Sequence, residues 1–242
     1  MSNYHSNITF NIDTWSALSP ELTNIERWQD WANHQVWPEH SGASLNYSNI
    51  PPMVRRRMSR LSKITVSLAL QLLEQYNVDY LVFSSQHGEL HRSRKLIDDI
   101  LSGEPASPMA FSQSVHNTAA GLTTIISKQR IPHTSISAGD NTFQSAIIEA
   151  WLYLTTNPGK KVLLIDFDEP LPMVYKEFEV QVFQPFALGL VLSSGDEYTL
   201  HKVETVPCSQ KLPQGLDFIR QLLSSKNEWQ IGSSNQTWLW KK

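Results

Sequence analysis

The sequence predicts an α/β fold, in which strands and helices alternate and the helices cover a sheet. Two continuous apolar runs, at residues 162–166 and 186–193, are typical of strands that are buried on both faces. A third strand at 134–137 is followed by a Gly-Asp-Asn turn and by a helical pattern over 142–155. This strand–turn–helix unit favours a layered α/β sheet over an all-α or all-β fold.

The remaining elements follow in chain order from the same periodicities. Ile8, Phe10 and Ile12 alternate with polar residues and predict a short strand, and the tryptophan-rich stretch behind it reads as irregular. Helical spacing predicts helices over residues 54–75, 90–101, 116–128 and 212–224. Further strands are predicted at 79–84 and, as an exposed edge, at 201–206. Gly and Pro at 103–108 indicate a loop, and 229–240 is too mixed to assign.

Composition excludes several classes of protein. The 242 residues carry a net charge of −3, so no excess of basic residues directs the chain to nucleic acid. The longest apolar runs are far shorter than the roughly 18 residues that predict a membrane span. The N-terminus lacks the basic and apolar regions of a secretory signal, and the single Cys208 cannot form an internal disulfide. We therefore expect a cytoplasmic protein.

Two acidic motifs are candidates for chemistry. Asp140 lies in the turn before the 142–155 helix, where a carboxylate caps a helix more often than it reacts. Asp166 and Asp168 end an apolar strand in an Asp-x-Asp pattern, which resembles the first motif of haloacid-dehalogenase-type phosphatases. Acidic residues in a solvated loop after the strand are the commoner explanation of so short a match.

Other sites are weaker or excluded. The basic run Arg55, Arg56, Arg57 and Arg60 suits either a phosphate-bearing carrier or a solvated helix face, of which the second is commoner. The sequence contains no Gly-x-Ser-x-Gly elbow of a serine hydrolase. Its eight histidines form no His-x-x-x-His pair on a predicted helix, so neither a metal site nor a cofactor is expected.

Two segments, residues 111–122 (FSQSVHNTAAGL) and 132–142 (PHTSISAGDNT), resemble the N-terminal half of β-ketoacyl synthases. In that family an Asn-x-x-Ala-Gly helix precedes a Pro-x-x-Ile strand, and a nucleophilic Cys sits at the turn into the next helix. Asn117, Ala120, Gly121 and Ile136 match this pattern, and Asp140 falls where the Cys would be. Residues 163–166 resemble the strand that follows that helix, and residues 186–192 resemble the family's glycine-containing strand that closes the first half.

This resemblance implies a thiolase-like, ketosynthase-like layered α/β sheet truncated to about one half. It implies a single domain over residues 1–242, with a core at about 51–194 and a short C-terminal extension. The chain lacks the His-Gly-Thr and Asn-x-Phe-Gly-Phe-Gly-Gly motifs of the second half, so it should not condense acyl chains alone. It is similar to the small chain-length-factor-like proteins of aryl polyene pigment pathways, which belong to type II polyketide systems.

The resemblance therefore implies a noncatalytic subunit that pairs with a ketosynthase, meets acyl carrier protein transiently and helps shape the acyl tunnel. A metal-dependent phosphatase using Asp166 and Asp168, and a pure scaffold, remain as alternatives. By resemblance, the 108–111 loop would approach the partner's tunnel and the 134–137 strand would pair across the dimer interface. The expected tunnel and interface residues are Met109, Ala110, Phe111, His116, Asn117, Thr134, Ser135, Ile136 and Ser137, with Arg55, Arg56, Arg57 and Arg60 as a weaker carrier contact.

Overall fold

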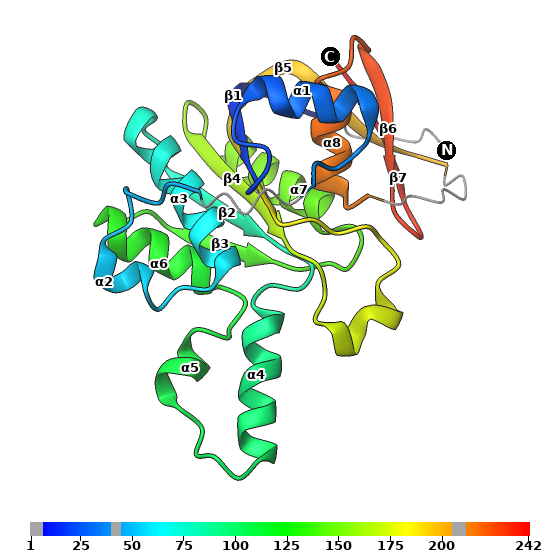
Figure 1. The fold of residues 1–242 in the computed structure, drawn as a ribbon. Coiled ribbons are helices and arrows are strands. Elements are labelled where there is room, and N and C mark those ends of the chain that lie inside the picture. The colour runs from blue at the N-terminus through cyan, green and yellow to red at the C-terminus, as the bar shows by residue number, and fades with distance from the viewer. Residues whose placement is uncertain (1–6, 40–44, 205–211) are drawn as a thin grey trace, which may run out of the picture.

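The computed structural model describes residues 7–39, 45–204 and 212–242 (Figure 1). A seven-stranded sheet runs through it in the order β3-β2-β4-β5-β7-β6, and β1 pairs with β5. Strand β2 is parallel to β3 and β4, whereas the other pairs are antiparallel. The strands are β1 (Ile8–Leu18), β2 (Tyr80–Ser84), β3 (His133–Ile136), β4 (Lys161–Asp168), β5 (Phe186–Val203), β6 (Glu228–Gly232) and β7 (Thr237–Lys241).

Helices cover both faces of this sheet, as the apolar strand runs predicted. Side chains alternate along β4, so that Leu163 and Ile165 pack under α3 and α6 while Val162 and Leu164 pack under α7. The layered α/β prediction is confirmed. The helices are α1 (Ile25–His34), α2 (Pro52–Arg55), α3 (Arg60–Gln75), α4 (Leu90–Leu101), α5 (Pro108–Ser112), α6 (Thr118–Ser127), α7 (Thr142–Thr156), η1 (Met173–Phe178) and α8 (Gln214–Leu222).

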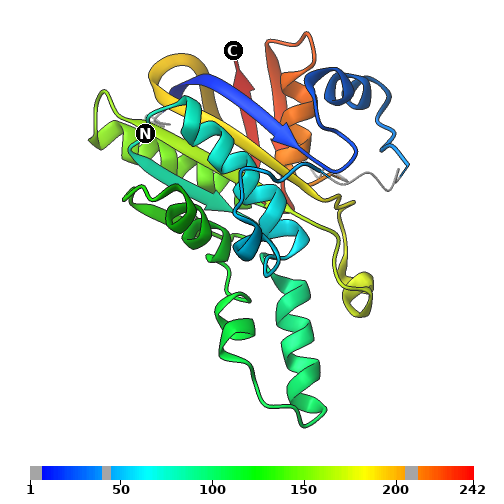
Figure 2. The same cartoon turned by 60° about the vertical axis from the view of Figure 1, so that its left-hand side comes forward.

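Helices α4 and α5 form an arm, residues 90–112, that projects away from the sheet in both views (Figures 1 and 2). Leu96 is the buried side chain of α4, so the arm rests on little core of its own. Its base is fixed at Glu89, which accepts hydrogen bonds from the hydroxyls of Ser59 and Ser62 and pairs with Arg92 at 3.4 Å. The arm is thus an extension that is anchored at its base and whose outer faces meet solvent in this chain.

Three expectations for the first half of the chain are wrong. The 54–75 helix is divided into α2 and α3, because Ser59 is extended and its side chain caps α3 by accepting the Ser62 N–H at 2.8 Å. The tryptophan-rich stretch is ordered: Trp15 lies in β1, and Trp28 and Trp31 lie in α1. The 108–111 loop is helix α5, which begins at a proline and is capped by Ser107.

The C-terminal part also differs from expectation. Residues 201–203 continue β5 and pair with β7, so they are not an edge, while 205–206 lie outside the described residues. The unassigned 229–240 segment forms the β6–β7 hairpin, which carries Trp229, Trp238 and Trp240 into the core. The other predicted strands and helices are confirmed. Most of their ends shift by a few residues, whereas β1 and β5 continue well beyond the predicted segments, to Leu18 and Val203. Among the described residues, no helix has the length and apolar character needed to cross a bilayer.

Candidate functional site

The turn between β3 and α7, residues 137–142, is held by its own backbone and by the C-terminal elements. Gly139 has a φ of +58°, a left-handed conformation that suits glycine. The Thr142 hydroxyl accepts the Ala138 N–H at 2.8 Å and donates to the Gly139 carbonyl at 2.6 Å. These bonds fix the direction in which the neighbouring Asp140 side chain leaves the turn.

Asp140 does not cap α7, contrary to the commoner expectation. Its Oδ2 accepts the backbone N–H of Ser234 at 2.6 Å, and Ser234 lies in the turn between β6 and β7. The N-cap residue of α7 is Asn141, whose side chain makes no capping bond. Asn141 Oδ1 instead accepts the Gln214 amide at 3.3 Å and the Trp238 indole N–H at 3.2 Å. The turn is therefore tied to α8 and to the β6–β7 hairpin.

Asp166 and Asp168 are buried inside β4, so the expectation of a solvated loop is wrong. Asp166 accepts the Ser84 hydroxyl at 2.6 Å. Both oxygens of Asp168 are engaged, since it accepts the Ser85 hydroxyl at 2.8 Å and the N–H groups of Gln86 and His87 at 2.8 and 3.2 Å. The two carboxyls therefore shape the loop that leads from β2 into the arm.

Burial dominates the electrostatics of this acidic pair. It raises the pKa of Asp166 to about 8 and that of Asp168 to about 7, although the hydrogen bonds from residues 84–87 act in the opposite direction. Gly215 leaves room for this carboxyl, because a Cβ at residue 215 would lie 2.0 Å from Asp166 Oδ2 and would force one of the two to shift. Carboxyls already bonded in this way suit a structural role better than the phosphatase alternative. The described residues contain no group of three His, Cys, Asp or Glu that could hold a metal ion.

Strand β3 is an edge of the described sheet. The carbonyls of Pro132 and Ile136 accept N–H groups of β2 and its extension, at 3.0 and 3.2 Å. Because backbone groups alternate sides along a strand, the N–H of Ser135 points to the open edge. The Ser135 hydroxyl is buried without a hydrogen-bond partner in the described chain. Thr134 is half-buried beside it, and Ser137 donates to the Gln86 carbonyl at 3.0 Å.

The residues predicted to meet the tunnel lie on α5 and at the start of α6. Met109 is 47% exposed and Phe111 62% exposed, with the half-buried Ala110 between them. His116 contacts the Ser85 carbonyl through Nε2 at 2.8 Å, and Asn117 is exposed at the start of α6. The arm thus presents an apolar helical face, with His116 at its base.

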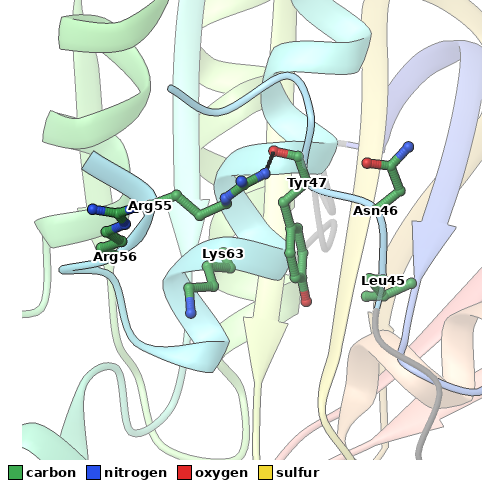
Figure 3. Close-up of a pocket in the computed structure, with 6 residues that line it drawn as sticks. All are labelled: Leu45, Asn46, Tyr47, Arg55, Arg56 and Lys63. Carbon is green, nitrogen blue, oxygen red and sulfur yellow. Dashed lines mark hydrogen bonds between the residues drawn. The ribbon is translucent and has the colours of Figure 1, made fainter. Parts of the chain in front are cut away.

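The basic run is not one helix face. Arg60 pairs with Glu169 at 3.1 Å, whereas Arg55 and Arg56 line a cavity of about 610 Å³. Lys63 and Tyr47, which sequence reasoning missed, complete its polar lining together with Asn46, and Leu45 adds an apolar wall (Figure 3). Arg57 is exposed outside this lining. Lys63 lies about one turn of α3 after Arg60, and this spacing is the signal that could have added Lys63 to the basic run.

The family model of the β-ketoacyl synthase N-terminal domain matches residues 28–241. The structure of a ketosynthase (ApeO) in complex with its chain length factor (ApeC) from Xenorhabdus doucetiae contains a chain 30% identical to this one. The alignment covers 97% of this chain and 99% of that chain, with a TM-score of 0.88.

More distant structures share the fold alone. The ishigamide ketosynthase/chain length factor is 14% identical, with a TM-score of 0.63 over 81% of this chain and 67% of that chain. A β-ketoacyl synthase from Burkholderia phymatum is also 14% identical, with a TM-score of 0.58 over 77% of this chain and 59% of that chain. A search of curated proteins finds no match. The thiolase-like prediction is confirmed, and the chain belongs to the β-ketoacyl synthase N-terminal domain family.

Proposed function

We propose that this chain is a noncatalytic subunit of the chain-length-factor kind, which pairs with a ketosynthase while an aryl polyene chain is elongated on acyl carrier protein. The proposal is supported by the relative from the ketosynthase–chain length factor complex, which matches over nearly the full length of both chains. A cytoplasmic location and a single domain with its core at about residues 51–194 belong to the same proposal.

The observation that carries the noncatalytic role is the carboxylate of Asp140 at the head of α7. The resemblance assigns the family's nucleophilic thiol to this position, and a carboxylate is a much poorer acyl acceptor than a thiolate. Asp140 is moreover engaged by the Ser234 N–H at 2.6 Å, which holds it against the β6–β7 turn. In this proposal the covalent chemistry takes place on the ketosynthase.

The proposed interface is the open edge of β3. An unpaired edge strand is a template for pairing with another chain, and the backbone N–H of Ser135 points outward at this edge of the described sheet. A partner strand would supply an acceptor for it. Thr134, Ile136 and Ser137 would then lie at or beside the interface.

The proposed tunnel contact is the α5 face of the arm. Met109 and Phe111 are large and exposed, and a chain growing toward them would gain roughly 0.8 kcal/mol per buried CH₂ until it met a wall. Further units would then cost roughly 1–3 kcal/mol in overpacking. The side chain at Ala110 would set how much room remains. A pure scaffold, the alternative, would leave product length independent of this residue.

A transient contact with acyl carrier protein is proposed for the basic run Arg55, Arg56, Arg57 and Arg60. Arg60 is committed in part to Glu169, so the contact would rest mainly on the other three.

The test of the proposal is co-expression with a ketosynthase from the same pathway, followed by gel filtration. Ser135→Pro removes the outward N–H and keeps the bonds to β2, because proline is tolerated where the N–H faces away from the sheet. Ser135→Ala is the matched control, since it retains the N–H. We expect a stable heterodimer with the wild type and with Ser135→Ala, and at least tenfold weaker association with Ser135→Pro. If the proline variant associated as tightly as the wild type, β3 would not be part of the interface.

A further inference from the structure

The cavity beside α2 and α3 is built from three separate pieces of chain. Arg55 ends α2, Arg56 follows it, Lys63 lies in the first turns of α3, and the 45–47 segment forms the remaining wall. Arg55 and Lys63 are half-buried, so their charges are partly withdrawn from water. The space measures about 610 Å³, within the range of roughly 300–1,000 Å³ that is typical of ligand pockets.

The charges in this cavity are not balanced by the protein. The described residues of its lining include three cationic side chains and no carboxylate. In the part of the chain that the structure describes, Arg56 and Lys63 make no ion pair, whereas nearby Arg60 and Arg92 each pair with a glutamate. The whole chain has a net charge of −3, so this convergence does not come from an excess of basic residues. Like charges brought together in a recess repel one another unless an anion joins them.

The donors are also oriented in advance. The Arg55 guanidinium donates from Nη1 to the Tyr47 carbonyl at 2.9 Å, which is the dashed bond in Figure 3. That bond holds the planar fork across one side of the cavity and leaves its other N–H groups available. Burial raises the pKa of Tyr47 to about 12, so its hydroxyl remains a neutral donor at physiological pH. Among the described residues, the side chains of this lining that can accept a hydrogen bond are neutral, namely the Asn46 amide and the Tyr47 hydroxyl.

We propose that this cavity binds the phosphate group of a phosphate ester. Arg and Lys donors suit phosphate oxygens, and a guanidinium can engage two of them at once. The volume leaves room for an organic substituent, which would lie along the apolar Leu45 wall. The ligand is either the prosthetic phosphopantetheine of a carrier protein or a free phosphate compound. The first source rests on the proposed function, whereas the phosphate site itself does not.

The first experiment measures binding by calorimetry to the full chain, purified alone or with the ketosynthase where the two co-purify. The probes are 4′-phosphopantetheine and inorganic phosphate, with pantetheine, which lacks the phosphate, as the matched ligand control. Lys63→Gln and Arg56→Gln remove a charge and keep most of the side chain. Lys202→Gln, at an exposed position near the end of β5, is the control variant. Because the variants alter this chain alone, binding by the ketosynthase cancels in the comparison.

We expect phosphopantetheine to bind and pantetheine not to bind. Each cavity variant should weaken binding at least tenfold, and Lys202→Gln should leave it unchanged. The affinity should fall with salt, and the melting temperature of Lys63→Gln without ligand should be unchanged or slightly higher because repulsion is relieved. Equal binding of phosphopantetheine and pantetheine, no binding of either phosphate probe, or an unaffected Lys63→Gln variant would overturn the proposal.

A second arm identifies the source with apo and holo carrier protein, which differ only in the phosphopantetheine. Loss of affinity confined to holo carrier with Lys63→Gln assigns the site to the prosthetic group. If Lys63→Gln weakens the binding of inorganic phosphate but leaves the affinity for both carriers unchanged, the site is assigned to a free phosphate compound. Equal loss for both carriers means that acidic side chains occupy the cavity, which contradicts the phosphate assignment. Heterodimer formation by the same variants reports separately on the proposed function.

Discussion

Replacing Asp140 by alanine removes the acceptor for the Ser234 N–H, which lies 2.6 Å from Oδ2. A hydrogen bond to a charged group contributes about 1.5–3 kcal/mol, and the half-exposed setting places this one at the lower end. A carboxylate at a helix start adds about 0.3–1 kcal/mol. We expect Asp140→Ala to lower the free energy of unfolding by about 2–2.5 kcal/mol. For a chain of this length that corresponds to a fall of roughly 4–10 °C in melting temperature.

Asp140→Asn is the matched control, because its amide oxygen can accept the same N–H. It should recover about half of the loss and leave heterodimer formation and elongation activity intact. Hydrogen exchange of the peptide that contains Ser234 reports on the bond directly, with faster exchange expected in Asp140→Ala than in Asp140→Asn. Equal exchange in wild type and Asp140→Ala would refute the structural role. Loss of elongation by Asp140→Asn in an intact complex would show that the carboxylate takes part in chemistry.

Three further predictions concern the buried acids and the arm. The pKa values of Asp166 and Asp168 are raised in the folded state, so their contribution to stability is present at low pH and is lost as pH rises toward 8. We therefore expect the urea concentration at the midpoint of unfolding to decrease as pH is raised from about 5 to about 9. Asp168→Asn should flatten that fall, and an unchanged slope would contradict the raised values. Gly215→Ala should destabilise the chain by roughly 1–3 kcal/mol in chemical denaturation, since its Cβ would meet Asp166 Oδ2 at 2.0 Å, and unchanged stability would show that the two can separate freely. Ala110→Phe should shorten the carrier-bound products seen by mass spectrometry, whereas Phe111→Ala should lengthen them or broaden their distribution. Identical products at normal complex yield would leave the arm with a packing role alone.

The layers of the fold could be read from sequence because they depend on local apolar periodicity. The β6–β7 hairpin was also readable in principle, since buried Trp229 and Ile231 alternate with exposed Glu228 and Gln230. The division between α2 and α3 has a local signal as well, in the capping serine at position 59. In the second case the helical spacing over residues 54–75 outweighs this local signal.

The buried acids could not be placed in this way. A strand pattern ends at the first carboxylate because burying a charge is costly, yet β4 continues through Asp168. The donors that allow this come from Ser85 and Gln86, more than 80 residues away along the chain. In the same way, the partner of Asp140 is a backbone N–H 94 residues distant. Contacts between remote segments leave no periodic trace in a single sequence.

The basic cavity combines both cases. Arg55 and Arg56 were visible as part of a charged run, but Tyr47 and Lys63 join them only through the fold of the 45–47 segment against α3. Arg60 belongs to the same run in the sequence, but its side chain does not line the cavity and instead pairs with Glu169, which follows β4. Sequence therefore indicated the charge, and the structure indicates which charges converge.

The most direct test of the noncatalytic role is intact-mass analysis of the co-purified complex after it has been loaded with acyl groups from acyl carrier protein. The proposed role predicts an acyl adduct on the ketosynthase chain and an unmodified mass for this chain. An acyl adduct on this chain, at Asp140 or elsewhere, would contradict it.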